Sequence, residues 1–412
     1  MRFKKLMLVT LLLLAILTVS AVSADENATA DIAEIDDAVE IDDEINDDVL
    51  GADDEDVISA DGNGTFSFGT LARQFIWYPE SEIYLNHDYI YIGPEYYVDE
   101  MGVNRTLVDK YGIDIGYNVT IHGNGHKFEA YNLARIFNIH SSNVVLKDIV
   151  FVNGKSDDEG GSILWIAKGG TLDNCTFINS NARTGGAVYV NGDGMTITSC
   201  KFDGCSANTG GAIYMNSTGA EVTYCKFEDT SANDPAGAIY WESDGGIMSG
   251  CKFINCSSGQ GGGAAIKMMG ADGIVTDCTF DKCHGWDIGW AGSGPIDWRG
   301  ARGKVSNCNF KDSHSERAGS IYWGGVDGTL SNCTFDNCSE DNLGTLLWTG
   351  KNGTVTECNF TNCYVTGGHS QAIGGAIYWE GANGTVNNSN FINCSANYSI
   401  GGAIAWTGTN GT

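Results

Sequence analysis

Adjacent tyrosine and tryptophan residues recur along this sequence and are its clearest candidates for ligand binding. The tyrosines are Tyr189, Tyr214, Tyr240, Tyr322 and Tyr378, and the position after them holds Trp165, Trp241, Trp298, Trp323, Trp348, Trp379 and Trp406. Seven of the ten tryptophans therefore share one position of a repeat. A column of flat rings exposed on a surface would be a platform for sugar rings or for aromatic groups of a partner.

The two aromatic columns cannot both point inward, because neighbouring residues of a regular strand face opposite ways. Parity with the aliphatic residue before each pair favours Trp inside and Tyr outside. A glycine-rich turn follows Trp directly, however, and could turn that ring outward. Both columns therefore supply candidate binding residues: Tyr189, Tyr214, Tyr240, Tyr322, Tyr378, Trp241, Trp298, Trp323 and Trp379. The alternative is that stacked rings only stabilise neighbouring repeats, and we favour this interpretation slightly.

Acidic residues in a repeat of 30 residues, from Phe280 to Phe310, are the candidates for catalysis. Polysaccharide lyases and glycoside hydrolases need carboxylates, or a cation with a base, converging on one face. Asp287, Asp297 and Arg299 lie close in sequence, with His284 nearby, and Asp297 takes the place of the usual Tyr. A solvated loop with an internal ion pair explains the same residues and is the favoured interpretation, so no catalytic residue is assigned.

Metal and cofactor sites have little support in the sequence. Asp157, Asp158 and Glu159 form a triple acid that could bind Ca²⁺, although such a run is usually just solvated. The Cys-x4-Cys spacing is not that of a zinc knuckle. We therefore expect neither a metal nor a cofactor.

A repeat of 25 to 31 residues determines the expected fold. It is marked by Phe151, Phe177, Phe202, Phe227, Phe253, Phe280, Phe310, Phe335, Phe360 and Phe391. An apolar residue stands five positions before each Phe, and an aliphatic column (including Ile163, Ala265 and Ile296) precedes the Tyr-Trp positions. Three short apolar segments per repeat predict three short strands, hence a right-handed parallel β-helix of about 25-residue coils.

The cysteines belong to the same pattern. Eight stand two residues before Phe and six stand three residues after it, which places all fourteen in inward columns. Asn, Asp or Gly sits at many of the bends beside them, where a left-handed backbone is needed. We favour stacked free thiols over disulfides, because parallel stacked side chains present the disulfide torsion poorly.

The two ends differ from the repeat. Residues 1–24 read as a signal peptide, with a basic start, an apolar run and a small-residue cleavage site. Residues 25–62 are acidic, without Lys or Arg, and predict a disordered spacer. Residues 63–110 form the expected N-terminal cap, including an amphipathic capping helix over 66–77 that buries Phe68, Leu71, Phe75 and Ile76. The β-helix covers 111–412, and the incomplete last repeat favours a piece of a longer protein.

The composition narrows the range of partners. The formal net charge is −29, so nucleic acid is an unlikely partner. Apart from the apolar run near the start, no segment of the sequence is long and apolar enough to span a bilayer. The expected location is therefore secreted, extracellular or at the cell surface.

The repeat resembles a known family. Gly-Gly-Ala-Ile at 210–213, 374–377 and 401–404, alternating with the Phe-to-Cys segments 253–256 and 391–394, resembles the polymorphic outer membrane protein repeat. The whole arrangement is more similar to the adhesin-like surface proteins of methanogenic archaea. That similarity includes the acidic spacer and the segments 63–66, 119–126, 135–138 and 145–148. The resemblance covers about residues 60 to 412 and supplies no catalytic residues.

The resemblance implies a secreted β-helical rod with an adhesive role. Its expected partners are glycans or proteins on other cells or in the cell wall. Two alternatives remain open: a polysaccharide lyase or glycoside hydrolase centred on Asp287, Asp297 and Arg299, and a cell-wall spacer that binds nothing.

Overall fold

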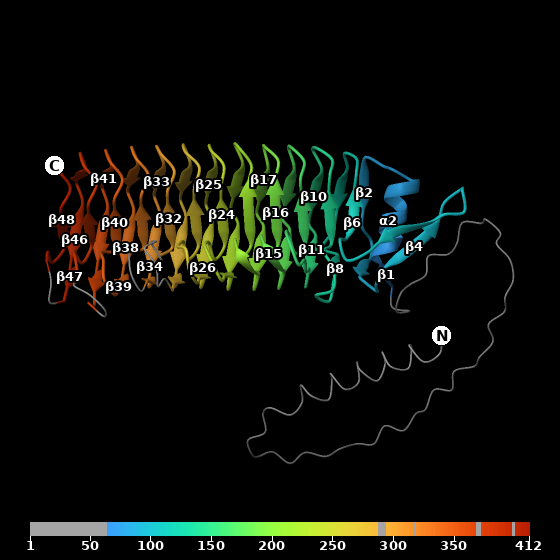
Figure 1. The fold of residues 1–412 in the computed structure, drawn as a ribbon, viewed down its shortest axis with the longest axis horizontal. Coiled ribbons are helices and arrows are strands. Elements are labelled where there is room, and N and C mark those ends of the chain that lie inside the picture. The colour runs from blue at the N-terminus through green and yellow to red at the C-terminus, as the bar shows by residue number, and fades with distance from the viewer. Residues whose placement is uncertain (1–63, 287–293, 316–318, 368–371, 398–399) are drawn as a thin grey trace, which may run out of the picture. The chain divides into compact units, whose positions relative to one another are not determined.

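A computed structural model of the chain describes residues 64–286, 294–315, 319–367, 372–397 and 400–412. The described part lies in one compact unit, Asp56–Thr412. Short strands stack side by side along the long axis of this unit, and each coil of the chain adds one rung (Figure 1). The predicted signal peptide, the predicted spacer and the candidate Asp287 lie outside the described residues.

Three long parallel sheets confirm the three predicted strands of each coil. The aliphatic sheet has 12 strands. They are β2 (Glu82–Tyr84), β7 (Thr120–His122), β10 (Val145–Lys147), β13 (Thr171–Asp173), β17 (Thr196–Thr198), β21 (Glu221–Thr223), β25 (Ile247–Ser249), β29 (Ile274–Thr276), β33 (Lys304–Ser306), β37 (Thr329–Ser331), β41 (Thr354–Thr356) and β45 (Thr385–Asn387).

The Phe sheet follows in each coil and has 13 strands. They are β1 (Thr65–Ser67), β3 (Asp88–Ile90), β8 (Lys127–Glu129), β11 (Val150–Val152), β14 (Thr176–Ile178), β18 (Lys201–Asp203), β22 (Lys226–Glu228), β26 (Lys252–Ile254), β30 (Thr279–Asp281), β34 (Asn309–Lys311), β38 (Thr334–Asp336), β42 (Asn359–Thr361) and β46 (Asn390–Ile392).

The Tyr-Trp sheet closes the coil and has 12 strands. They are β6 (Ile113–Ile115), β9 (Phe137–Ile139), β12 (Ile163–Trp165), β16 (Val188–Asn191), β20 (Ile213–Asn216), β24 (Ile239–Trp241), β28 (Ile266–Met268), β32 (Ile296–Trp298), β36 (Ile321–Trp323), β40 (Leu346–Trp348), β44 (Ile377–Trp379) and β48 (Ile404–Trp406).

A fourth, short sheet was not predicted. It has nine strands and lies between the Phe and Tyr-Trp sheets along the chain. They are β15 (Asn181–Thr184), β19 (Ser206–Thr209), β23 (Ser231–Ala232), β27 (Ser257–Ser258), β31 (His284–Gly285), β35 (His314–Ser315), β39 (Ser339–Glu340), β43 (Tyr364–Val365) and β47 (Ser395–Ala396). Its strands are two to four residues long and mostly polar, so they carry almost no apolar signal.

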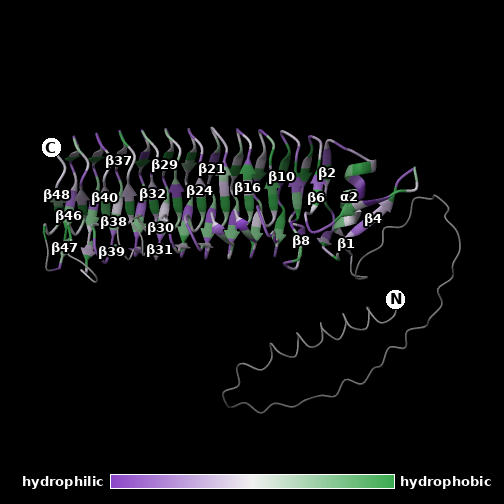
Figure 2. Ribbon diagram, in the orientation of Figure 1, coloured by the Kyte–Doolittle hydropathy of each residue, from purple (hydrophilic) through white to green (hydrophobic). Residues whose placement is uncertain are grey.

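Inward side chains stack on their copies in the next coil and form the core. Phe177 and Phe202 have ring centroids 4.8 Å apart and nearly parallel planes, and Trp323 and Trp348 repeat this geometry at 4.5 Å. Apolar residues recur along the stack in Figure 2. The indole of Trp348 fills the space that a Cβ on Gly353 would occupy, which explains a glycine five residues after the tryptophan.

Left-handed residues make the bends, as predicted. Each of the fourteen cysteines follows a residue with positive φ, for example Asn332 (φ 49°) before Cys333. Many bend asparagines bond their copies, as Asn332 Nδ2 does to Asn307 Oδ1 at 2.8 Å. The Cys333 thiol donates to the carbonyl of Ser331, 3.2 Å away. All fourteen cysteines are free thiols, and thirteen of them are buried.

The N-terminal end is capped by α2 (Phe68–Trp77), as predicted. Phe68, Leu71 and Phe75 are buried, but Ile76 is exposed, contrary to the expectation. Glu95 holds the start of the helix, because its carboxylate accepts from Ser67 Oγ at 2.9 Å and from the Gly69 amide at 2.8 Å. Glu95 begins β4 (Glu95–Val98), which pairs antiparallel with β5 (Asn104–Val108).

One predicted column position is wrong. Ile239 pairs with Ile266 rather than Ala265, because the loop before this strand carries one residue more than expected from its neighbours. Within the residues that the structure describes, no helix is long and apolar enough to cross a membrane.

Candidate functional site

The Tyr column lies on the outer face of the Tyr-Trp sheet. Tyr189, Tyr214 and Tyr240 are aligned in register and half-buried. Their centroids are 5.0 and 5.1 Å apart, with planes only 12–13° from parallel. Each ring face between two neighbours is therefore covered, so the column presents ring edges and hydroxyls to solvent instead of the predicted platform.

The hydroxyl of Tyr214 is also engaged, since it donates to the carboxylate of Glu242. Burial, followed by this carboxylate, raises the pKa of Tyr214 above its ordinary value. Tyr378 donates similarly to Glu380 at 2.7 Å. Many ring faces and hydroxyls of the Tyr column therefore already contact neighbouring residues and are not available to a ligand.

The prediction that four tryptophans bind a ligand is wrong. Trp241, Trp298, Trp323 and Trp379 are each 0% exposed, on the inner face of the same sheet. Parity with the aliphatic column decides their direction, and the glycine-rich turn leaves it unchanged. An external ligand cannot reach these four rings.

The candidate catalytic residue Asp297 takes the predicted place in the Tyr column, between Lys267 and Tyr322. It is 0% exposed, however, and its carboxylate lies 3.1 Å from Lys267 Nζ and 2.5 Å from Arg299 Nε. The Arg299 guanidinium lies over the ring of Tyr322, 4.1 Å from its centroid. This arrangement is a closed ion-pair cluster, which leaves Asp297 no free oxygen for a substrate.

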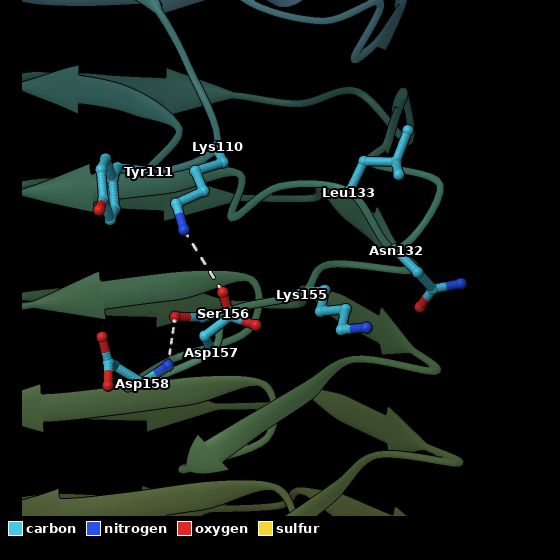
Figure 3. Close-up of a pocket in the computed structure, with 8 residues that line it drawn as sticks. All are labelled: Lys110, Tyr111, Asn132, Leu133, Lys155, Ser156, Asp157 and Asp158. Carbon is cyan, nitrogen blue, oxygen red and sulfur yellow. Dashed lines mark hydrogen bonds and ion pairs between the residues drawn. The ribbon is translucent and has the colours of Figure 1, made fainter. Parts of the chain in front are cut away.

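A pocket of about 170 Å³ lies where the short sheet begins (Figure 3). Its walls come from the end of the cap (Lys110, Tyr111), from a turn after β8 (Asn132, Leu133) and from residues 155–158. Tyr111 and Leu133 are 54% and 63% exposed. Among the described residues, no other aromatic ring stacks on Tyr111. The Lys110 ammonium lies over the Tyr111 ring, 5.3 Å from its centroid. An exposed aromatic ring beside amide, hydroxyl and charged groups is the usual composition of a site for a polar ligand with apolar faces.

A buried arginine holds this pocket in shape. Arg135 is 5% exposed, and its guanidinium donates to the carbonyls of Gly160 (3.0 Å) and Glu159 (2.8 Å) and to Ser156 Oγ (3.0 Å). Its backbone amide donates to the carbonyl of Lys110. Burial lowers the pKa of Arg135, while Glu159 and other acids nearby oppose that shift. Arg135 is therefore a positioning residue that ties the cap to the 156–160 loop.

The pocket continues into a groove of about 470 Å³ over the outer face of the short sheet. Lys155, Ser156 and Asp157 line both. The groove then follows the same two positions on three successive coils. These positions are occupied by Asn181, Ser206 and Ser231, and by Arg183, Asn208 and Asn233.

Charged groups are concentrated at the join of pocket and groove. Lys110 Nζ and Arg183 NH2 each lie 3.4 Å from a carboxylate, of Asp157 and Asp158 respectively. Among the described residues, the ammonium of Lys155 makes neither an ion pair nor a hydrogen bond, and no dashed line reaches it in Figure 3. Three cations and two carboxylates therefore line this region of a strongly acidic chain.

Sequence reasoning missed Lys110, Tyr111, Lys155 and Arg183 as site residues. Lys155 and Arg183 break the short sheet's columns of Ser and Asn, and that break was the available signal. The predicted triple acid lies here too, but Asp157 and Asp158 face cations. The described residues contain no group of three or more acidic, His or Cys side chains placed to hold a metal.

Comparisons with known proteins bear on the fold. Residues 161–294 match the family described as right handed beta helix region. No curated protein matches the chain. Among solved structures, the A-module of the Azotobacter vinelandii mannuronan C-5 epimerase AlgE4 aligns with a TM-score of 0.43 and 9% identity, over 85% of this chain and 96% of that one.

Two further solved structures align comparably. The tailspike protein of E. coli bacteriophage HK620, solved with a pentasaccharide, gives a TM-score of 0.44 and 10% identity, over 77% of this chain and 62% of that one. A mannuronic acid specific polysaccharide family 6 lyase from human gut microbiota gives 0.37 and 11%, over 80% and 82%. At these values the similarities carry no information on activity. The stacked parallel sheets and the family match together identify the fold as a right-handed parallel β-helix.

Proposed function

We propose that this protein is a secreted, adhesin-like surface protein that binds glycans in the pocket and groove at the start of the short sheet. The observation that carries the proposal is the continuous site itself. An exposed ring, Tyr111, opens onto a row of amides, hydroxyls and cations that crosses successive coils. The family resemblance and the signal-peptide pattern of residues 1–24 support the location.

The spacing of the groove suits a linear glycan. Rungs of a parallel sheet repeat every ~4.8 Å, which is comparable to the length of one sugar unit in an extended chain. Asn181, Ser206 and Ser231 therefore place polar groups at successive rungs, with Asn181 Nδ2 also donating to the carbonyl and the Oγ of Ser206. Sugar hydroxyls need such donors and acceptors, and bridging water can complete the contacts.

The site is better equipped for binding than for cleavage. Its two carboxylates, on Asp157 and Asp158, face Lys110 and Arg183. The other candidate, Asp297, is enclosed by Lys267 and Arg299. A general acid or base needs an accessible carboxyl in reach of the substrate, and these contacts work against that role.

A glycan array with the full chain tests the proposal, with product analysis for each hit. We expect binding without cleavage, and binding weakened by Arg183→Ala. Lys252→Ala is the matched control, because Lys252 is an exposed strand residue on the Phe sheet, away from the groove. Cleavage would support the enzyme alternative. Binding to no glycan, or equal binding by the Arg183→Ala variant, would overturn the proposal.

A further inference from the structure

The ammonium of Lys155 lies where the pocket and the groove of the proposed site meet. It lines both the pocket and the groove, and it is exposed. In the short sheet it lies at the first rung, paired with Asn181, in a column where the next coils carry Asn, Ser and Ser. A cation thus stands where the repeat has only neutral side chains nearby.

The neighbouring charges do not neutralise Lys155. Asp157 is taken up by Lys110, and Asp158 by Arg183. These pairs leave an excess of one positive charge at the join, although the chain as a whole carries −29. The buried guanidinium of Arg135 bonds the 156–160 loop and is offset by the carboxylates of Glu159 and Asp114, so it does not change this excess.

These contacts indicate the chemical class of the ligand. We propose that the glycan carries an anionic group, a carboxylate or a sulfate ester, which binds to the ammonium of Lys155 at the join of the pocket and the groove. This inference rests on the proposed glycan-binding function and specifies its ligand class. Charge-assisted hydrogen bonds from an ammonium to an anion are stronger than neutral ones, so a neutral glycan loses most at this position.

Matched oligosaccharides test the inference on the full chain. One arm uses oligouronates and their carboxyl-reduced, neutral counterparts, and the other uses sulfated oligosaccharides and their desulfated counterparts. We expect the neutral counterpart to bind about tenfold more weakly in the arm that contains the right anion. The two arms distinguish a carboxylate from a sulfate. Binding should also weaken as salt is added, because Lys155 is exposed to solvent.

Variants separate Lys155 from the charge of the whole surface. Lys155→Gln should remove the preference for the anionic oligosaccharide and bring its affinity down to that of the neutral one. Lys252→Gln should leave the preference unchanged. If neutral and anionic oligosaccharides bind alike, or if the preference survives Lys155→Gln, the inference is wrong while glycan binding stands. If no oligosaccharide binds, the proposed function falls with it.

Discussion

The Tyr column and the pocket beside the cap both bring tyrosine to the surface, but in different states. Tyr214 has a ring on each side at about 5 Å and a hydroxyl bonded to Glu242. Tyr111 is 54% exposed and has no stacked ring among the described residues. In a regular solenoid, a side chain's copy one rung away is its nearest partner. Side chains that interrupt the repeat lack such a copy, so they are the ones that remain available to a ligand.

The same rule separates the two polar sites. Asp297 breaks the Tyr column, but Lys267 and Arg299 lie beside it and close the cluster. Lys155 breaks the short sheet's column at its first rung, and its ammonium has no ion-pair partner among the residues that the structure describes. A break in the repeat marks a candidate site, and its immediate neighbours decide whether the candidate is open.

The largest expected effect is on stability and concerns the inner column. Trp348 is fully buried between Trp323 and Trp379, at 4.5 and 4.8 Å. Trp348→Ala should lower the free energy of unfolding by about 3–5 kcal/mol through the lost contacts and the cavity. Thermal and denaturant unfolding measure the loss. A loss of unfolding free energy below about 1 kcal/mol would contradict our claim that the stacked inner tryptophans stabilise the fold.

A second prediction concerns Glu340, a buried acidic residue that interrupts the pattern of the short sheet. Glu340 is 0% exposed, and its carboxyl accepts from the hydroxyls of Ser315 (2.5 Å) and Ser320 (3.4 Å), with the Cys338 thiol nearby. Burial raises its pKa well above the ordinary value. The folded state therefore holds this proton more tightly than the unfolded state, so stability falls as pH rises above the unfolded pKa of about 4.5.

Glu340→Gln should remove that penalty, because the amide is neutral at every pH and can still accept from Ser315. The variant should melt a few degrees higher than the native protein at pH 7 and differ little from it near pH 4. Melting curves across this range check the prediction. A variant less stable at pH 7 would mean that the carboxyl is satisfied as an anion.

The smallest effect is expected for a serine substitution in the cysteine column. Cys333 donates to Ser331 O, and Ser389, in the same column, donates equivalently to Asn387 O at 2.9 Å. Cys333→Ser should therefore cost about 1 kcal/mol or less, since the hydrogen bond is kept. Cys333→Val should cost more, about 1–3 kcal/mol, through overpacking and the lost donor. Denaturant unfolding of the two variants compares them, and the reverse order would refute a hydrogen-bonding role for the column.

The fold could be predicted from the sequence because the repeat reports every column several times. Phe177, Trp348 and Cys333 all lie inward, as their period indicates. The short sheet could not be predicted, because strands such as β23 (Ser231–Ala232) are too short and too polar to leave a period. The register at Ile266 was missed because a single added loop residue shifts the column locally.

The candidate site was harder to predict than the fold. Lys110 and Tyr111 come from the cap, and Lys155 and Arg183 come from later coils, so only the folded chain brings them together. The burial of Asp297 depends on Lys267 in the preceding coil, which is equally invisible in a local reading. A repeat pattern predicts the position of residues that follow it, and the residues of the candidate site depart from the pattern.

The central claim is that ligand binding belongs to the break in the repeat and not to the Tyr column. Affinity for the best array hit, measured by titration calorimetry on native protein, Tyr111→Ala and Tyr214→Ala, tests it most directly. Both substitutions remove one tyrosine ring from the surface. We predict that Tyr111→Ala binds up to about tenfold more weakly, while Tyr214→Ala binds like the native protein and loses only stability. Unchanged binding by Tyr111→Ala together with weakened binding by Tyr214→Ala would contradict this account.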